Sequence, residues 1–430
     1  MASAPIRHDL RRNFFWAALS GALFECGAAF ADTRTVVPAF LSRVTPSSFA
    51  VGAAESLARF GWLLPQLFAA NYAQGLRHRK PIYLVAGWGR AVCLGLLAAP
   101  LILWGAGNGA ATVLALFFAL WTGFSFISGL AGVPYNDIVG RTIPSDRRSR
   151  LLAVRVLVGG ALAVGAGLLI RVILKRGQEE SLGSYGMIFG VGATVLAVST
   201  LCFAAMREPP APIRRERPDL GAFLREGWYV LQADARFRLF VHAQWVAGLT
   251  TMAFPFYVLQ ARRLSGVGEA EVGTLLAAQM FGALALNPLW GWWGDRQGKL
   301  SLLKLLAVTG LISPLLAMAL PWLSRLPPVL MLSGYAVAFF FVGAASSGRV
   351  VGDLGYLMEI SPDDRRPEYS GYMNALVAPS RLLPMVAGLL VEAVSFQVLF
   401  ALAALAVLAR LGLLAKLERT AAMAELRHSR

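Results

Sequence analysis

The sequence predicts an all-α membrane protein with twelve transmembrane helices in two six-helix bundles. First, the 430 residues are 57% hydrophobic and 15% charged, whereas about a quarter of the residues in an ordinary soluble protein are charged. Second, the apolar residues gather in twelve runs, each close to the roughly 20 residues that a helix needs to cross a bilayer. Third, short basic connections alternate along the chain with connections that are poor in cations, as in multi-pass membrane proteins.

The predicted spans follow the apolar runs in chain order. The runs are solidly apolar and lack the alternation of apolar and polar residues that a β-barrel strand requires, so we predict helices. The spans are 14–41, 49–73, 82–104, 111–135, 151–174, 185–206, 238–260, 271–292, 301–322, 328–350, 370–393 and 395–416. We interpret the first run as a retained span and not as a cleaved signal peptide.

The distribution of cations predicts the topology. Even-numbered connections are basic, as at Arg79 and Lys80 or Arg147 and Arg148, and both ends of the chain are basic as well. Cations near spans stay on the cytoplasmic side, so we expect both termini in the cytoplasm and a multi-pass protein of the inner or plasma membrane. The net charge of +16 is spread over these connections, which suits anionic lipid head groups better than a nucleic acid.

The sequence contains no pattern typical of an enzyme, a metal site or a cofactor site. Its three cysteines lie inside apolar runs, without the spacing of metal ligands or redox pairs. It contains no hydrolase, zinc-protease or nucleotide-binding motif. We therefore expect no enzymatic activity, cofactor, metal or nucleic-acid partner.

The chain divides into two similar halves. Pro144 and Pro362 follow the fourth and tenth runs, and each is followed by an acidic residue and a pair of arginines. A repeat of this kind predicts two like-oriented bundles with a cavity between them. We expect an N-terminal bundle over 1–207, a cytoplasmic linker over 208–236 and a C-terminal bundle over 237–430. In the linker, a proline-rich segment precedes an amphipathic helix, which we place on the membrane surface.

The loop after the eighth run carries a recognisable motif. It contains Gly291, Asp295, Arg296, Gly298 and Lys299. With the twelve runs and the repeat, it resembles the signature G-x-x-x-D-[RK]-x-G-[RK]-[RK] of the major facilitator superfamily (MFS), and lacks only the last basic residue. The resemblance implies the MFS fold and secondary active transport by alternating access.

The motif also has a physical interpretation. Gly291 and Gly298 would permit close packing and a tight turn, and Asp295 would accept hydrogen bonds at a neighbouring helix N-terminus. Arg296 and Lys299 would hold this gating loop at the head groups. The alternative is a plain basic turn between two helices. In the first half, Gly75 and His78 stand where the family has aspartate and glycine, which argues against a similar lock there.

Polar residues within the spans are candidates for a transport cavity, because a charge in the bilayer needs a partner or water. Glu25 or Asp32 would bind a proton, and Arg59, Arg90 or Arg381 would hold an anionic group or regulate a carboxylate pKa. The alternative is internal pairing, as of Glu55 with Arg59. The candidates are Glu25, Asp32, Arg34, Glu55, Arg59, Trp62, Gln66, Arg90, Trp121, Gln244, Gln279, Asn374 and Arg381.

These observations predict a monomeric secondary transporter that moves a small-molecule substrate through the lipid bilayer, with protons as the candidate coupling ion. The alternatives are a non-transporting membrane scaffold or receptor and a lipid-handling protein on the same fold. Neither the substrate nor the direction of transport follows from the residues.

Overall fold

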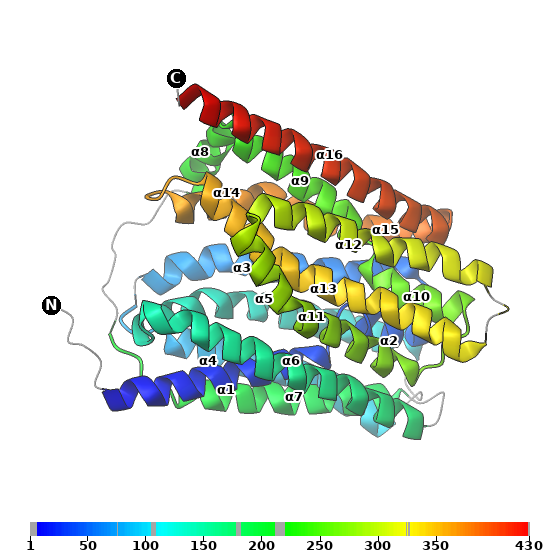
Figure 1. Cartoon of the computed structure of the whole chain (residues 1–430). Helices are drawn as coiled ribbons and strands as arrows, with labels where there is room; N and C mark the ends of the chain where they lie inside the picture. Colours follow the sequence, from blue (N-terminus) through cyan, green and yellow to red (C-terminus); the bar gives the residue numbers. More distant parts are fainter. Residues whose placement is uncertain are drawn as a thin grey trace. The chain divides into compact units, whose positions relative to one another are not determined.

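The protein is helical throughout the part of the chain that the computed structural model describes (Figure 1), which confirms the predicted all-α class. The described residues are 7–74, 76–104, 109–177, 182–210, 220–323, 325 and 327–428. Gly75 and the segment 211–219, with most of the proline-rich linker, lie outside them. The contacts group into two compact units, and each is described by itself.

Unit 1 takes the described residues within 1–46, 54–217 and 268–280. A short segment from the second half of the chain is therefore part of the unit that the first half builds. Its helices are α1 (Arg7–Ala29), α2 (Val36–Val44), most of α3 (Ser48–Gln74), α4 (Lys80–Trp104), α5 (Ala110–Thr142), α6 (Ser145–Arg176), α7 (Gly183–Ala204) and the start of α11 (Glu271–Arg296).

Unit 2 takes the described residues within 47–53, 218–267 and 281–430. It includes the first turns of α3 and most of α11. Its other helices are α8 (Leu220–Ala233), α9 (Ala235–Thr251), α10 (Phe254–Leu264), α12 (Lys299–Ala319), the short helix η2 (Leu320–Leu323), α13 (Pro328–Ile360), α14 (Arg366–Val377), the short helix η3 (Ala378–Leu382), α15 (Leu383–Ala393) and α16 (Phe396–His428).

The predicted spans agree with these helices in position. Every one of the twelve runs overlaps a helix or a broken helix. Within the described ranges, nine helices are long and apolar enough to cross a membrane, so the count of twelve stays a prediction. The first, seventh and eleventh runs break into shorter helices, and the ninth run ends in the short helix η2. The sequence analysis did not predict these breaks.

The first run breaks because Asp32 ends α1 and begins α2. Its Oδ1 accepts hydrogen bonds from the backbone amides of Arg34 and Thr35 at 2.9 and 3.0 Å and from the Thr35 hydroxyl at 2.9 Å. A carboxylate that binds its own downstream backbone stabilises a turn in place of a continuing helix. Prolines mark the other breaks: Pro255 lies in the first turn of α10, and Pro379 and Pro384 lie in those of η3 and α15.

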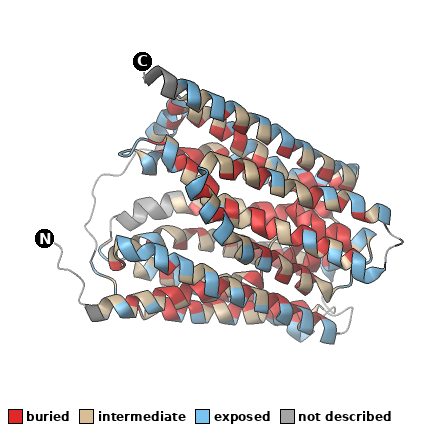
Figure 2. Ribbon diagram, in the orientation of Figure 1, coloured by how far each residue is buried: buried red, intermediate tan, exposed pale blue. Residues whose placement is uncertain are grey.

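Apolar side chains cover the outside of the helices as well as their interfaces. Figure 2 shows buried and exposed residues alternating along individual helices such as α16. On α4, Val85, Val92 and Leu96 are 71%, 53% and 54% exposed, and on α16 Leu405 is 60% exposed. Exposed apolar stripes of this length are stable in lipid and not in water, which supports a membrane protein.

Aromatic packing fixes the helices of unit 1 around its charged residues. Phe40 of α2 contacts Phe117 of α5 and both Tyr185 and Phe189 of α7, with ring centres 5.3–5.5 Å apart. At the opposite end, Tyr83 of α4 packs in a buried cluster with residues of α1, α5 and α7. We call this second end, where the connections at 76–79 and 143–144 lie, the basic end. It is the end that the cation distribution predicts to be cytoplasmic.

The linker helix α8 packs against α14 in unit 2. Phe223 contacts Tyr372 with ring centres 4.7 Å apart, while Leu224, Trp228 and Tyr229 are exposed. The predicted helix is therefore present, and one of its faces is used for packing. Its position on a membrane surface stays a prediction.

Candidate functional site

The central candidate site in unit 1 is an ion pair between Glu25 of α1 and Arg155 of α6. The Arg155 Nη2 donates to Glu25 Oε1 at 2.8 Å, and Nη1 donates to the Tyr135 hydroxyl of α5 at 3.1 Å. The Glu25 side chain is 42% exposed and the Arg155 side chain 20%. A charge near the bilayer centre costs about 2.5–3.5 kcal/mol on insertion scales, so such a pair is expected to border water or a bound solute.

Two glycines make the space for this ion pair. A Cβ on Gly21 would lie 2.5 Å from Arg155 Cδ, and a Cβ on Gly159 would lie 3.0 Å from Glu25 Cβ and Cγ. Each glycine is on the same helix as one partner and faces the side chain of the other. The missing side chains therefore let Glu25 and Arg155 cross the interface between α1 and α6.

Arg90 of α4 adds a second cation to this region. It is 5% exposed, and its guanidinium carbon lies 4.8 Å from the Phe24 ring centre and 6.0 Å from the Tyr83 ring centre. Within the described residues, Arg90 forms no ion pair and its Nε has no hydrogen-bond partner. Glu25 therefore compensates Arg155 alone, and one positive charge is left over. We call Glu25, Arg90, Tyr135 and Arg155 the Glu25 cluster.

The candidates Asp32, Arg34 and Gln279 lie at a helix break. Beside its bonds to the Arg34 and Thr35 amides, Asp32 accepts a hydrogen bond at Oδ2 from Gln279 Nε2 at 3.0 Å. Gln279 is 1% exposed. Both Asp32 oxygens thus hold backbone or side-chain donors, which gives this carboxylate a clear structural role. Its predicted role in proton binding remains a prediction.

Glu55 and Arg59 form the predicted ion pair one turn apart on α3. Arg59 Nε donates to Glu55 Oε1 at 2.5 Å, and Glu55 is 1% exposed. Arg34 lies within electrostatic range of Asp32, Glu55 and Arg59. These two cations and two carboxylates balance, unlike the Glu25 cluster.

The remaining unit 1 candidates differ in exposure. Trp121 is 1% exposed and its Nε1 donates to the carbonyl of Ala54 at 2.9 Å, so it packs α5 against α3. Trp62 is 49% exposed. The Gln66 Nε2 is buried and has no partner among the described residues, which leaves a donor available on the same helix as Trp62.

Three candidates belong to unit 2. Gln244 is half-buried on α9, Asn374 is exposed on α14, and Arg381 is half-buried in η3. The predicted cavity shared by Glu25 and Arg381 thus involves both units, and it stays a prediction.

The gating-loop motif matches its physical interpretation in part. Gly298 has a φ of 83°, a left-handed conformation that favours glycine, and it directly precedes α12. Asp295 pairs with Lys299 at 2.7 Å and is 77% exposed, so its contact is a side chain one turn away and not the expected helix N-terminus. The guanidinium of Arg296 lies 5.2 Å from the Trp292 ring centre. A Cβ on Gly291 would meet nothing within 4 Å, so the expected close packing at Gly291 is wrong.

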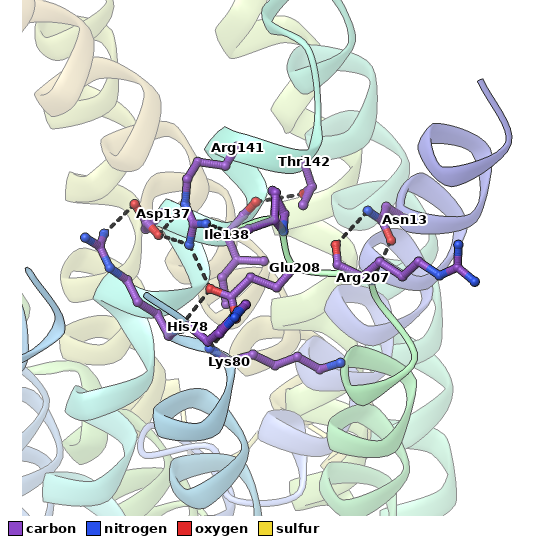
Figure 3. A network of polar contacts seen from close by, with 11 residues as sticks. Asn13, His78, Lys80, Asp137, Ile138, Arg141, Thr142, Arg207 and Glu208 are labelled. Carbon is purple, nitrogen blue, oxygen red and sulfur yellow. Dashed lines mark hydrogen bonds and ion pairs between the residues drawn. The ribbon is translucent and has the colours of Figure 1, made fainter. Parts of the chain in front are cut away.

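At the basic end, Glu208 organises a network that the sequence analysis missed (Figure 3). Its carboxylate accepts the amides of Arg79 and Lys80 at 2.7 and 2.9 Å, at the start of α4, and Arg141 Nη2 at 2.8 Å. Asp137 pairs with both Arg79 and Arg141 at 2.5 Å. Burial raises the pKa of Glu208. Hydrogen bonds from the Arg79 amide, the Arg141 side chain and the Lys80 amide, together with the Arg141 charge, lower it by more, so the pKa lies below its usual value.

Glu208 supplies a carboxylate to the start of α4. The first-half loop has no carboxylate at the motif position, and a residue that follows α7 supplies one to the helix N-terminus instead. Sequence spacing could not find this, because Glu208 is 128 residues from Lys80 along the chain. The one available signal was the acidic residue between Arg207 and Pro209 in a strongly basic connection.

Other ionic contacts were also missed. In unit 1, Glu269 pairs with Arg43 and accepts the Tyr185 hydroxyl at 2.8 Å. In unit 2, Asp353 of α13 pairs with Arg410 of α16 at 3.2 Å, and Arg410 is only 4% exposed. Among the described residues, histidine, cysteine, aspartate and glutamate form no group that could hold a metal ion.

Comparison with known sequences finds a family match in the second half of the chain. Residues 247–427 match the sequence model of the Major Facilitator Superfamily. Uncharacterized proteins of Mycobacterium tuberculosis and Mycobacterium bovis are 24% identical over 185 residues, which is 41% of this chain. The match spans about a third, 34%, of the length of these relatives.

Comparison with solved structures covers nearly the whole chain. The nucleoside transporter NupG has a TM-score of 0.74 at 11% identity, over 94% of this chain and 99% of that one. The D-xylose-proton symporter has a TM-score of 0.69 at 15% identity, over 93% and 96%. A bacterial homologue of the iron transporter ferroportin in its inward-facing state has a TM-score of 0.65 at 13% identity, over 96% and 99%. Identities this low show the fold alone. The second half of the chain therefore matches the major facilitator superfamily, and the chain shares the fold of these multi-pass membrane proteins.

Proposed function

We propose that the protein is a secondary active transporter that moves a small molecule across the membrane by alternating access. The family match and the transporters that share its fold support transport in general. The observation that carries the proposal is the Glu25 cluster. A carboxylate that is 42% exposed, an arginine and a tyrosine meet where two glycines leave room for the ion pair between α1 and α6, and this exposure supports access by a solute.

The charge of the cluster favours a substrate with an anionic group. Arg90 and Arg155 together exceed Glu25 by one positive charge, and aromatic rings border both guanidinium groups. A carboxylate or phosphate on the substrate would compensate the extra charge, and an arginine binds either with paired hydrogen bonds. Apolar parts of the substrate would contact Phe24 and Tyr135.

Proton coupling is the finer part of the proposal, and it rests on Glu25. When an anionic substrate pairs with Arg155, Glu25 loses its compensating cation. We therefore propose Glu25 as the carrier of the coupling proton. We further propose that the protein acts as a monomer in the inner or plasma membrane, with both termini in the cytoplasm.

The first experiment is a thermal-shift screen of the purified full-length protein against metabolites and drugs, because a ligand of the folded state raises the melting temperature. Hits are then tested on Glu25→Gln and Arg155→Gln, with Glu226→Gln on α8 as a control that makes the same charge change as Glu25→Gln. We expect both cluster variants to lose the ligand-dependent shift while the control keeps it. Unchanged shifts in both cluster variants would exclude the Glu25 cluster as the substrate site.

Transport itself is tested in proteoliposomes with the hit compound. Uptake that rises with an imposed pH gradient supports proton coupling. Uptake that is the same with and without the gradient excludes proton coupling. A ligand that binds but is never transported would instead favour the alternative, a receptor or scaffold on this fold.

A further inference from the structure

A pocket at the basic end of unit 1 lies apart from the Glu25 cluster. It has a volume of about 590 Å³, and it lies where α1, α4 and the end of α7 meet. Its polar lining consists of Arg12, His78, Lys80, Arg207 and Glu208. Its apolar lining consists of Pro81, Leu84, Ala204, Ala205 and Met206.

The backbone that follows α7 holds two cations of the pocket close together. Arg12 Nη2 donates to the carbonyl of Ala205 at 2.9 Å, and Lys80 Nζ donates to the carbonyl of the next residue, Met206, at 2.7 Å. Neither side chain forms an ion pair with a carboxylate among the described residues. Like charges repel, so a fold that fixes two cations on adjacent carbonyls favours an anion between them.

The carboxylates near the pocket are already occupied. Asp9 pairs with Arg207 at 2.7 Å, and Glu208 is engaged by Arg141 and by two backbone amides of α4. The Glu208 side chain is 3% exposed, whereas His78 beside it is 59% exposed. Figure 3 shows Lys80, His78, Arg207 and Glu208 within this single network. The positive charges of Arg12 and Lys80 are therefore left for a ligand.

An apolar stripe extends from the pocket along α4. Pro81 and Leu84 line the pocket itself, and Val85, Trp88 and Val92 continue the same helix with exposures of 71%, 41% and 53%. A ligand that matches both features has an anionic head and a hydrocarbon chain. Free phosphate would satisfy the two cations but would leave the stripe without a partner.

We propose that this pocket binds the phosphodiester head group of an anionic phospholipid, whose acyl chains lie along α4. Arg12 and Lys80 hold the phosphate, and His78 contributes a hydrogen bond at the mouth of the pocket. Basic pockets between transmembrane helices on the cytoplasmic side suit such head groups. Since Arg12 and Lys80 also hold the segment that leads to Glu208, a bound lipid would stabilise the network at the start of α4.

The test measures lipid binding to the purified, delipidated full-length protein by native mass spectrometry. Dioleoyl phosphatidylglycerol is the probe, and dioleoyl phosphatidylcholine, which has the same chains and a zwitterionic head, is the reference. A basic residue near an anionic lipid contributes about a fivefold factor in affinity. We expect the double variant Arg12→Gln/Lys80→Gln to bind phosphatidylglycerol about 25-fold more weakly, with little change for phosphatidylcholine.

The matched control is Arg77→Gln, which removes a cation from the same connection as Lys80 but outside the pocket lining. It should leave phosphatidylglycerol binding within about twofold of wild type. If the control and the double variant lose phosphatidylglycerol affinity equally, the loss comes from general surface charge and not from the pocket. Binding by the double variant within twofold of wild type would overturn the site.

Two further arms keep the test decisive. If the double variant does not fold, the single variant Arg12→Gln should still show a loss of about fivefold, and Arg12→Lys, which keeps the charge, should restore binding. Inorganic phosphate at the same concentrations should neither stabilise the protein nor displace the lipid. If phosphate stabilises the protein as much as phosphatidylglycerol does, the occupant is a soluble anion and the lipid assignment is wrong.

Discussion

Replacing Gly167 of α6 with alanine should loosen the contact between α6 and the start of α11. A Cβ at this position would lie 2.6 Å from the backbone nitrogen of Ala277 and 2.9 Å from its Cα. The obstacle is backbone, so no side-chain rotation can relieve it. Gly165, two residues earlier on the same helix, offers a matched control because a Cβ there meets nothing within 4 Å.

The two substitutions share one energetic effect and differ in another. Alanine is about 1 kcal/mol more favourable than glycine inside a helix, and both variants gain this. Gly167→Ala must also push the start of α11 outward, and overpacking of this kind costs about 1–3 kcal/mol. Since about 1.4 kcal/mol is a tenfold change in an equilibrium constant, the arrangement in which the start of α11 has moved away from α6 should become about 5- to 150-fold more populated.

The assay labels a cysteine introduced at Thr274, in the segment of α11 that belongs to unit 1. Cys26, Cys93 and Cys202 are first replaced by serine, and a membrane-impermeant maleimide is applied from outside. We expect Gly167→Ala to increase the labelling rate at least about fivefold, and Gly165→Ala to leave the rate unchanged with an equal or higher melting temperature. Equal labelling in the two variants would refute the packing argument.

Three further predictions concern ionic contacts, measured by thermal unfolding in detergent. Glu208→Gln should destabilise the protein by about 1 kcal/mol at pH 7 through loss of the helix cap. The pKa of Glu208 in the folded protein lies below its ordinary 4.5. The stabilisation by Glu208 is therefore fully present above pH 4.5 and is lost as the pH falls through the folded pKa. At low pH the variant should be as stable as the wild type. Asp353→Asn should lower the free energy of unfolding by about 2–3 kcal/mol, because it leaves the buried Arg410 uncompensated while Asp353 itself is 30% exposed. Asp295→Asn, in an exposed ion pair, should lower it by under about 1 kcal/mol. Glu392→Ala should cost about 1 kcal/mol, because Glu392 accepts the Phe49 amide and the Ser47 hydroxyl at the start of α3.

Hydropathy predicted the fold well because a bilayer imposes one simple requirement on a helix. A run of about 20 apolar residues has few alternatives to a transmembrane helix, and each predicted run overlaps helical structure. The helix breaks were harder to predict. Asp32 was interpreted as a cavity charge, although its own downstream amides make it the origin of the turn between α1 and α2.

Candidate sites were harder to predict, because ionic partners lie on different helices. Helical spacing correctly paired Glu55 with Arg59, since the two residues are one turn apart. Spacing could not pair Glu25 with Arg155, which are 130 residues apart. Arg155 was overlooked because it lies close to the basic start of the fifth run, where an arginine is ordinary.

The charged groups of unit 1 differ in how completely they are satisfied, and this difference bears on function. Glu208 is surrounded by amide and guanidinium donors, so its rearrangement would break several bonds at once. In the Glu25 cluster, the carboxylate has one ion pair and its side chain is 42% exposed, and among the described residues Arg90 pairs with no carboxylate. In the proposed mechanism, an anion that enters this cluster would replace Glu25 as the partner of Arg155, and the exposure of Glu25 would reduce the cost of losing its cation. A saturated network would hold one end of the unit fixed, and an unsaturated cluster would supply the exchangeable contact that the proposed carrier requires.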